Sequence, residues 1–228
     1  MKILFCSIEM FFLCCVSSVV IAAPIIDFAQ PFFEFGTILQ GDKVHHAFTF
    51  RNNGDAPLNI NKIRSSCGCT AVTSTASVIQ PQGKGQINAT FDSTNFSGKI
   101  HKTISVDTND PRSPSTTLTL SGKVKDIITV NPKQLSLGKL RINESRKSVI
   151  AIENNGPKVL TITSVKSPQS QIIATIDKKQ LKHNESASIS VTVTPHSGDR
   201  LMSGYLIITT NNPTKRDVII PIFGSVEP

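Results

Sequence analysis

The chain has 228 residues, with 24 Lys and Arg against 16 Asp and Glu, a formal net charge of +8, one Tyr and no Trp. Its basic residues are scattered, with short pairs such as 178–179 and 215–216 in place of a basic stripe with aromatic or helical readers of bases. This distribution argues against dedicated nucleic-acid binding, and we expect no nucleic-acid partner. It favours solubility and weak attraction to anionic surfaces.

The N-terminal residues 1–22 have the pattern of a secretory signal peptide. Lys2 precedes an apolar run from Met10 to Ile21, and Val20 and Ala22 are suitably placed before a predicted cleavage after Ala22. The run is too short to span a bilayer comfortably, and no later segment is long and apolar enough to do so. We therefore predict a periplasmic or secreted protein without a transmembrane segment.

A lipid anchor on Cys14 or Cys15 is the alternative fate of this segment. The sequence favours it less, because neither cysteine follows a Leu-small-small pattern and the apolar run continues past both. Cleavage removes these two cysteines together with Cys6, and leaves Cys67 and Cys69 in the mature chain. Outside the cytoplasm the pair lies in an oxidising compartment, where disulfides persist.

The rest of the chain is a tandem repeat. "FRNNGDAPLNI" at 50–60 recurs as "IENNGPKVLTI" at 152–162, an offset of 102 residues that several other blocks share. A constant offset over many blocks indicates two copies of one domain. We place the first domain at 23–125 and the second at 126–228.

Each copy has the alternation of apolar and polar residues that is typical of β-strands. The first copy shows it in "VHHAFTF", "INATF", "ISVDT" and "LTLSGKV", and no window has a sustained helical period. About seven short strands per hundred residues, separated by Gly, Pro and Asn turns, is the pattern of an immunoglobulin-like sandwich. We therefore predict an all-β chain of two tandem immunoglobulin-like β-sandwich domains after the signal peptide. The predicted core of the first copy comprises Phe33, Phe35, Phe48, Phe50 and Phe91.

Motifs of the first copy resemble those of a known family. They are Phe35-Gly36, the turn at 52–54, "PLNI" at 57–60 and "CGCT" at 67–70. From about residue 33 to residue 124, the chain resembles the bacterial exported domain-of-unknown-function 1573 family, which is similar to Hydin-type immunoglobulin-like domains. The resemblance implies a binding or scaffolding fold and no established reaction. The second copy has "SPQSQ" in place of Cys-Gly-Cys, so any chemistry of the cysteines belongs to the first domain.

Cys67 and Cys69 leave several roles open. A local disulfide at a strand end is one, and Gly68 permits the bend that it needs. So small a ring adds little stability and is expected to be comparatively easy to reduce. Two adjacent thiolates also suit Cu(I), the one candidate cofactor. Thiol–disulfide exchange and pairing with another molecule are the remaining roles.

The sandwich topology also predicts that three histidines share one pole with the cysteines. The predicted strands place Cys67 and Cys69 just after the third strand, His45 and His46 at the start of the second, and His101 at the start of the sixth. One interpretation is a Cys/His metal or redox site near the domain junction. The other, which we prefer, is that the histidines are solvated residues at strand ends.

The sequence thus predicts a non-enzymatic extracytoplasmic binding or scaffolding protein whose partner is another extracytoplasmic protein. One alternative is a thiol redox or copper-handling protein that uses Cys67 and Cys69. A second alternative is a periplasmic two-domain assembly chaperone. Such chaperones carry a basic cleft residue, which the sequence alone does not identify here.

Overall fold

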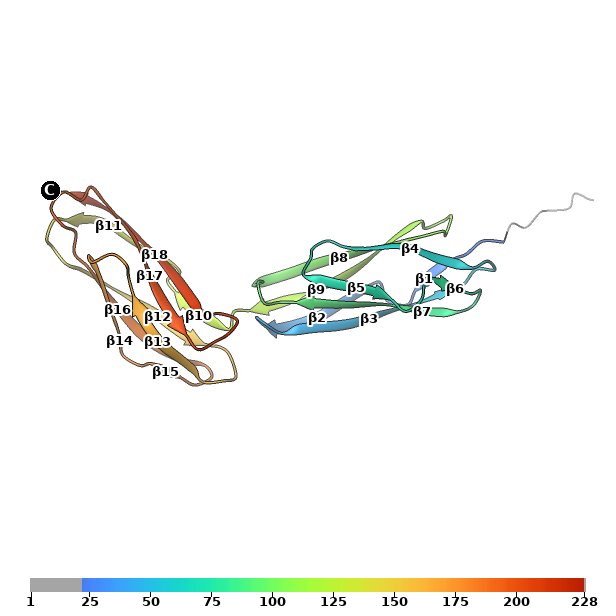
Figure 1. Ribbon diagram of the computed structural model, residues 1–228, viewed down its shortest axis with the longest axis horizontal. Coiled ribbons are helices and arrows are strands. Elements are labelled where there is room, and N and C mark those ends of the chain that lie inside the picture. Colours follow the sequence, from blue (N-terminus) through green and yellow to red (C-terminus); the bar gives the residue numbers. More distant parts are fainter. Residues whose placement is uncertain (1–21, 228) are drawn as a thin grey trace, which may run out of the picture.

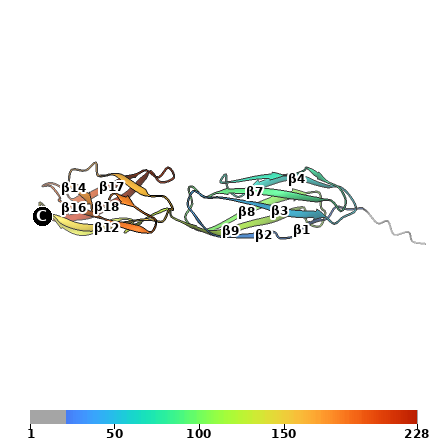
Figure 2. The same cartoon turned by 90° about the horizontal axis from the view of Figure 1, so that it is seen from below.

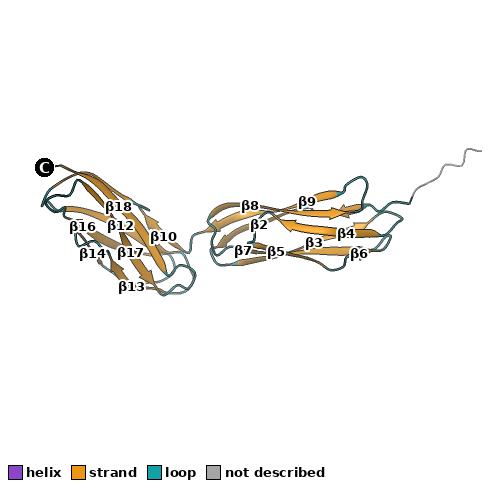
Figure 3. Cartoon of the chain, turned by 45° about the horizontal axis from the view of Figure 1, so that its top comes forward, coloured by secondary structure: helices purple, strands orange, loops and turns teal. Residues whose placement is uncertain are grey.

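The computed structural model describes residues 22–227, which form strands, turns and loops and no helix (Figure 3). The strands build two β-sandwiches that lie end to end in an elongated molecule (Figures 1 and 2). The predicted all-β fold of two tandem immunoglobulin-like domains is confirmed. The predicted signal peptide falls almost wholly outside the described residues. Among those that are described, the structure has no helical segment with the length and hydropathy of a membrane span.

The first domain contains nine strands in two sheets. Their orders are β1-β3-β7-β5 and β2-β9-β8-β4-β6. The strands are β1 (Ile26–Phe28), β2 (Phe32–Leu39), β3 (Lys43–Asn52), β4 (Leu58–Ser65), β5 (Thr70–Ser74), β6 (Val78–Ile79), β7 (Lys84–Asp92), β8 (Gly98–Thr108) and β9 (Ser115–Lys125).

The second domain repeats this arrangement, with sheets β10-β12-β16-β14 and β11-β18-β17-β13-β15. Only Asp126 and Ile127 separate it from β9. Its strands are β10 (Ile128–Asn131), β11 (Leu135–Arg141), β12 (Arg146–Asn154), β13 (Leu160–Lys166), β14 (Ile172–Ile176), β15 (Gln180–Leu181), β16 (Glu185–Val193), β17 (Leu201–Thr210) and β18 (Asp217–Glu227).

Each domain has nine strands and not the seven expected, because its first strand is divided between the two sheets. β1 pairs antiparallel with β3 in one sheet, whereas β2 pairs parallel with β9 in the other. A two-residue edge strand, β6 or β15, adds the ninth. Such short edges pair too few residues to leave a recognisable pattern in the sequence.

The glycine of Phe35-Gly36, which recurs in Leu137-Gly138, marks a β-bulge in each copy. Gly36 has φ +72° and Gly138 has φ +66°, and the register with the parallel neighbour shifts across both glycines. A left-handed backbone at a bulge favours glycine, because a Cβ would be strained there. This requirement explains why the glycine recurs 102 residues later.

The predicted aromatic core of the first domain lies where expected, with a graded burial. Phe48, Phe50 and Phe91 are buried, while Phe33 and Phe35 are half-buried and pack against the core from β2. The prediction is therefore confirmed for three side chains in the interior and two at its margin.

A buried asparagine fixes the same turn in both domains. The Asn52 side-chain amide donates to the carbonyls of Ala56 (2.8 Å) and Ile79 (3.1 Å), and its oxygen accepts from the Gly54 N–H (3.0 Å). Asn154 makes all three equivalent hydrogen bonds in the second domain. The repeated "NNG" of the sequence is thus a repeated hydrogen-bonded turn.

Candidate functional site at the domain junction

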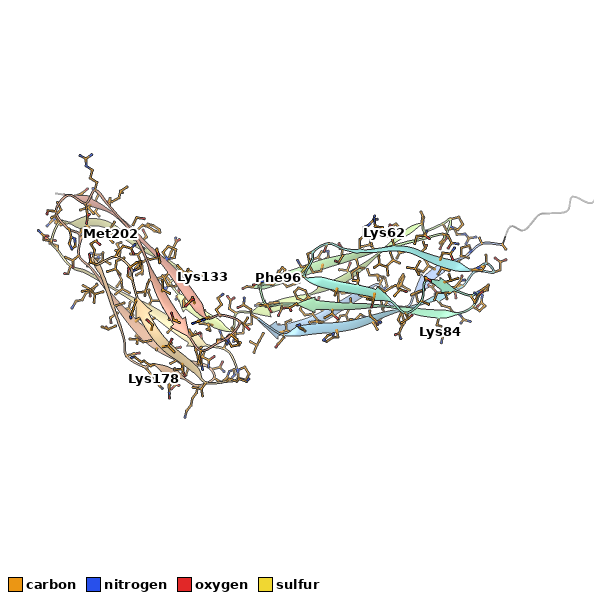
Figure 4. All side chains as sticks on the ribbon, in the orientation of Figure 1. Lys62, Lys84, Phe96, Lys133, Lys178 and Met202 are labelled. Carbon is orange, nitrogen blue, oxygen red and sulfur yellow. A yellow bond between two sulfur atoms is a disulfide. The ribbon has the colours of Figure 1, made fainter. Side chains whose placement is uncertain are left out.

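The Cys-Gly-Cys segment connects β4 to β5 at the end of the first domain that faces the second. The backbone N–H of Asp92, the last residue of β7, donates to the carbonyl of Cys69 at 3.0 Å. The Ser65 hydroxyl donates to the carbonyl of Cys67 at 2.7 Å. Cys69 packs against a small apolar cluster that includes Phe96, which is labelled at this end of the domain in Figure 4. Hydrogen bonds and packing therefore hold the segment in place.

In the structure the Sγ atoms of Cys67 and Cys69 are bonded to each other, with the two Cα atoms 5.3 Å apart. Both cysteines are half-buried and Gly68 between them is exposed. The Thr70 hydroxyl lies 3.7 Å from the sulfur of Cys67 and 3.9 Å from that of Cys69. A Cβ added to Gly68 would meet nothing within 4 Å, so the bend does not itself require glycine.

The second domain forms the same turn without cysteines. In the first domain the N–H of Thr70 donates to the carbonyl of Cys67 at 3.4 Å, and in the second the N–H of Ile172 donates to that of Gln169 at 3.1 Å. Gln169 stands 102 residues after Cys67. The fold therefore closes this turn with or without a sulfur–sulfur bond.

His45 and His46 lie on opposite faces of β3, because successive residues of a strand alternate between faces. His45 is exposed, with Nδ1 3.0 Å from the Thr90 hydroxyl. The His46 ring points inward, stacked on Phe33 with centroids 3.7 Å apart and edge-on to Phe48 at 4.5 Å. Burial among these rings lowers the pKa of His46 below its ordinary value, because it disfavours the charged imidazolium.

His101 lies on the outer face of β8, in the opposite sheet and across from Ser121. The three histidines thus occupy both outer faces and the interior of the sandwich, and the structure does not bring them together with Cys67 and Cys69. Within residues 22–227, no three His, Cys, Asp or Glu side chains are placed to hold one metal ion. The predicted shared pole therefore holds for the ends of these strands, but the side chains of the histidines do not meet there. Binding of Cu(I) by the two thiols in their reduced form stays a prediction.

A cleft of about 290 Å³ lies between the domains. The first domain contributes residues 39–42, and the second contributes residue 127 and the loops around 156–160 and 211–214. Most of its lining is apolar, from Leu39, Ile127, Pro157, Val159, Leu160 and Pro213. Lys158 and Asp42 are the charged residues of the lining, both exposed, and the Asp42 carboxylate accepts the Leu39 N–H at 2.9 Å, which leaves Lys158 as the cation of the cleft.

Gln40 is the polar residue that distinguishes this cleft. Its side chain is only 7% exposed, and its Oε1 has no hydrogen-bond partner among the described residues. Sequence reasoning missed it, because a glutamine in "LQGD" at 39–42 is expected to be a solvated turn residue. The second domain lies close to the next residue: a Cβ added to Gly41 would lie 3.0 Å from the Thr214 hydroxyl.

Two family models match the chain. Residues 26–124 match the family described as protein of unknown function (DUF1573). The first domain belongs to this family. The resemblance predicted from residue 33 to residue 124 is thereby confirmed and extends upstream to residue 26. The domain that follows this DUF1573 domain, at 126–225, matches the HYDIN/CFA65/VesB-like, Ig-like domain.

Among solved structures, a protein of unknown function from Porphyromonas gingivalis W83 is similar, with 16% identity and a TM-score of 0.41 over 88% of this chain and 99% of that one. PapD-like domain 7 of human CEP192 is similar with 13% identity and a TM-score of 0.39, covering 49% of this chain and 96% of its own. The secreted serine protease VesC from Vibrio cholerae has 15% identity and a TM-score of 0.38, covering 76% of this chain and 47% of its own. No curated protein matches the chain.

Proposed function

We propose that this DUF1573 protein is a non-enzymatic extracytoplasmic binding or scaffolding protein, which holds a segment of another exported protein in the cleft between its two domains. The observation that carries the proposal is the unpaired Oε1 of Gln40. A buried acceptor without a donor destabilises the folded protein by about 1–3 kcal/mol. Because Oε1 is closed off from solvent, it meets a donor only when the Gln40 amide rotates toward the cleft, where a ligand can supply one.

The chemistry of the cleft suits a polypeptide segment. A backbone N–H is the donor that Gln40 lacks, and the apolar walls accept short aliphatic side chains. The cleft volume of about 290 Å³ lies at the small end of ligand sites, which span roughly 300–1,000 Å³. That size favours one or two side chains of an extended segment. Lys158 adds a preference for an acidic residue or a terminal carboxylate, as expected of the cleft cation in a two-domain assembly chaperone.

Site-specific photo-crosslinking in the cell of origin tests the proposal. A photoreactive phenylalanine analogue replaces Val159, which lines the cleft and is 51% exposed. The matched control replaces Val78, which is 46% exposed and lies on β6, away from the cleft. We expect one crosslinked protein from position 159 and none from position 78.

Two cleft variants give the test its specificity. Gln40→Leu removes the acceptor, and Lys158→Gln removes the cation, so both should reduce the yield of the crosslink. Gln40→Leu should also unfold at an equal or higher temperature than the wild type, because it removes an unsatisfied buried group. A crosslink whose yield is the same in both variants and the wild type would show that the cleft does not bind the partner.

Thiol–disulfide exchange at Cys67 and Cys69 is a second candidate function. The equivalent turn of the second domain favours it, because that turn forms without a disulfide and a purely structural bond is therefore dispensable. In the exchange, a thiolate of a partner attacks one sulfur, the Cys67–Cys69 bond breaks and the other cysteine leaves as a thiolate. A second partner thiolate then attacks the mixed disulfide, so that the partner is oxidised and the pair is reduced.

Equilibration with glutathione buffers and thiol titration test this second function. A readily exchanged pair is expected, with a reduction potential well above about −300 mV. A more negative potential, typical of structural disulfides, would exclude exchange. Copper that survives dialysis in the reduced wild type but not in the Cys67→Ser/Cys69→Ser variant would indicate copper handling instead.

A further inference from the structure

The outer face of one sheet in the second domain carries an unusual number of exposed apolar side chains. On β17, Leu201 is 75% exposed and Tyr205 39%, and on β18, Ile219 is 59% and Phe223 40% exposed. These two strands are neighbours in the centre of the five-stranded sheet and can be followed side by side in Figure 1. We call this surface the β17–β18 face.

The strand register makes the β17–β18 face continuous. Ile207 lies opposite Ile219, Tyr205 opposite Pro221, and Ser203 opposite Phe223. Directly opposed residues of an antiparallel pair have Cβ atoms about 5 Å apart, so these side chains contact one another along the face. With roughly 200 Å² for a fully exposed large apolar side chain, the exposed fractions of Leu201, Tyr205, Ile219 and Phe223 amount to on the order of 400 Å².

The first domain shows that the fold does not require apolar residues at these positions. Its β8 and β9 have the same register, and their equivalent outward residues 102 positions earlier are polar. They form the pairs Ser105–Thr117, Thr103–Thr119, His101–Ser121 and Lys99–Lys123. The inward residues of β8 and β9, in contrast, are as apolar as those of β17 and β18. The duplicated strands therefore both have a mainly apolar inner face but differ in the polarity of the outer face.

We propose that the β17–β18 face is a docking surface for a protein partner that presents an apolar patch flanked by Asp and Glu. A folding role does not explain the apolar residues, because the first domain folds with polar ones. A contiguous apolar surface of this size on a soluble protein is commonly functional.

The charges around the face determine the kind of occupant. Lys166 lies beside Ile207 in register and has no ion-pair partner among the described residues. Lys139 and Arg141 lie along the opposite edge on β11, more than 70% exposed although each pairs with a glutamate at the surface. Glu227 and Glu144 are the partners of Lys139 and Arg141, and Asp217 lies at the start of β18. Arg200, directly before Leu201, is exposed and like Lys166 has no ion-pair partner among the described residues, so the unpaired charges around the face are mainly basic. A second copy, which also carries a net charge of +8, would be repelled, whereas an acidic partner is attracted.

The test replaces the apolar residues by those of the first domain. The double variant Ile219→Thr/Phe223→Ser introduces the residues that the first domain has at the equivalent positions, Thr117 and Ser121. The equivalent sheet of the first domain accommodates both side chains. The matched control is Ile173→Thr, an equally conspicuous residue, 64% exposed, on β14 of the opposite sheet. Leu201→Lys is a second test variant, and at 75% exposure it cannot disturb the core. Far-UV circular dichroism and Tm verify that all variants fold.

A photoreactive residue at position 201 captures the partner, so that it can be identified. The partner is then purified, and its affinity for the wild type and for each variant is measured by titration. We expect the affinity to fall roughly 100-fold in the double variant, as for two central apolar anchors, and to stay at the wild-type value in Ile173→Thr. Added salt should weaken binding to the wild type. The crosslink from position 159 should be unchanged in the double variant, which separates this result from that of the cleft.

Several results would overturn the proposal. One is an affinity that the double variant leaves intact, and another is a crosslink from position 201 no stronger than one from position 173. A wild-type dimer in sedimentation that the double variant abolishes would make the occupant a second copy. Binding to vesicles of phosphatidylglycerol and phosphatidylethanolamine that the double variant abolishes would make it a membrane.

Discussion

Asn52 and Asn154 occupy equivalent turns, so the contribution of this buried side chain to stability can be measured once in each domain. Asn52→Ala leaves two carbonyls and two backbone N–H groups without their partner, at the turn between β3 and β4. Each such hydrogen bond contributes about 1 kcal/mol net to stability, so the free energy of unfolding should fall by about 4 kcal/mol. Asn154→Ala removes three equivalent hydrogen bonds and should lower the stability of the second domain by about 3 kcal/mol.

Urea unfolding followed by two probes distinguishes the domains. Far-UV circular dichroism reports both sandwiches, whereas the fluorescence of Tyr205, the one tyrosine of the chain, reports the second. Asn154→Ala should shift the Tyr205 transition to lower urea, and Asn52→Ala should shift only the part of the circular dichroism change that belongs to the first domain. In the double variant the two costs should add, because the sites share no contacts.

The neighbouring asparagine supplies the control. Asn53 is exposed and donates one surface hydrogen bond to Asp27 at 2.8 Å, so Asn53→Ala should cost less than about 1 kcal/mol. If Asn52→Ala costs no more than Asn53→Ala, the buried hydrogen-bond network is not what fixes the turn, and our reasoning is wrong.

Three further outcomes are expected. Replacing Cys67 and Cys69 by Ala should lower the free energy of unfolding in urea by at most about 1.6 kcal/mol, because a three-residue ring restrains the unfolded chain little. A loss above about 3 kcal/mol would show that the disulfide serves to stabilise the fold. The folded pKa of His46 is below the unfolded value near 6.5, so stability should be full above about pH 6.5 and fall as the pH drops through the folded pKa. In His46→Phe this pH dependence should be absent when Tm is measured over a series of pH values. A dependence of Tm on pH equal to that of the wild type would contradict the prediction. Gly122→Ala should lower the free energy of unfolding by about 1–3 kcal/mol, since the added Cβ would lie 2.7 Å from the carbonyl oxygen of Gly36. An unchanged Tm would show that the two backbones do not approach each other this closely.

Short-range patterns carried most of the information on the fold. Alternation with a period of two identified strands such as the one at residues 44–50, because one face of each strand is buried. The offset of 102 residues identified the duplication, because each copy needs the same turns, such as that of Asn52 and Asn154, at the same places. The same alternation separates His45 from His46, so their opposite orientation follows from the strand itself once β3 is placed.

The functional surfaces depended on contacts between distant parts of the chain. Gln40 is buried without a hydrogen-bond partner for its Oε1, in a cleft that it lines together with loops of the second domain. The β17–β18 face could not be predicted from the sequence. The segment "VIIPIFG" at 218–224 is apolar at almost every position, so it lacks the alternation that would distinguish inward from outward residues.

The sequence by itself therefore determined two β-sandwiches with a single cysteine pair in the first of them, because strand periodicity, turn residues and repetition are local properties. Only the tertiary structure decided which side chains meet across the domain junction, and which apolar residues stay in contact with water. Both depend on the packing of segments far apart in the chain, which no local pattern encodes.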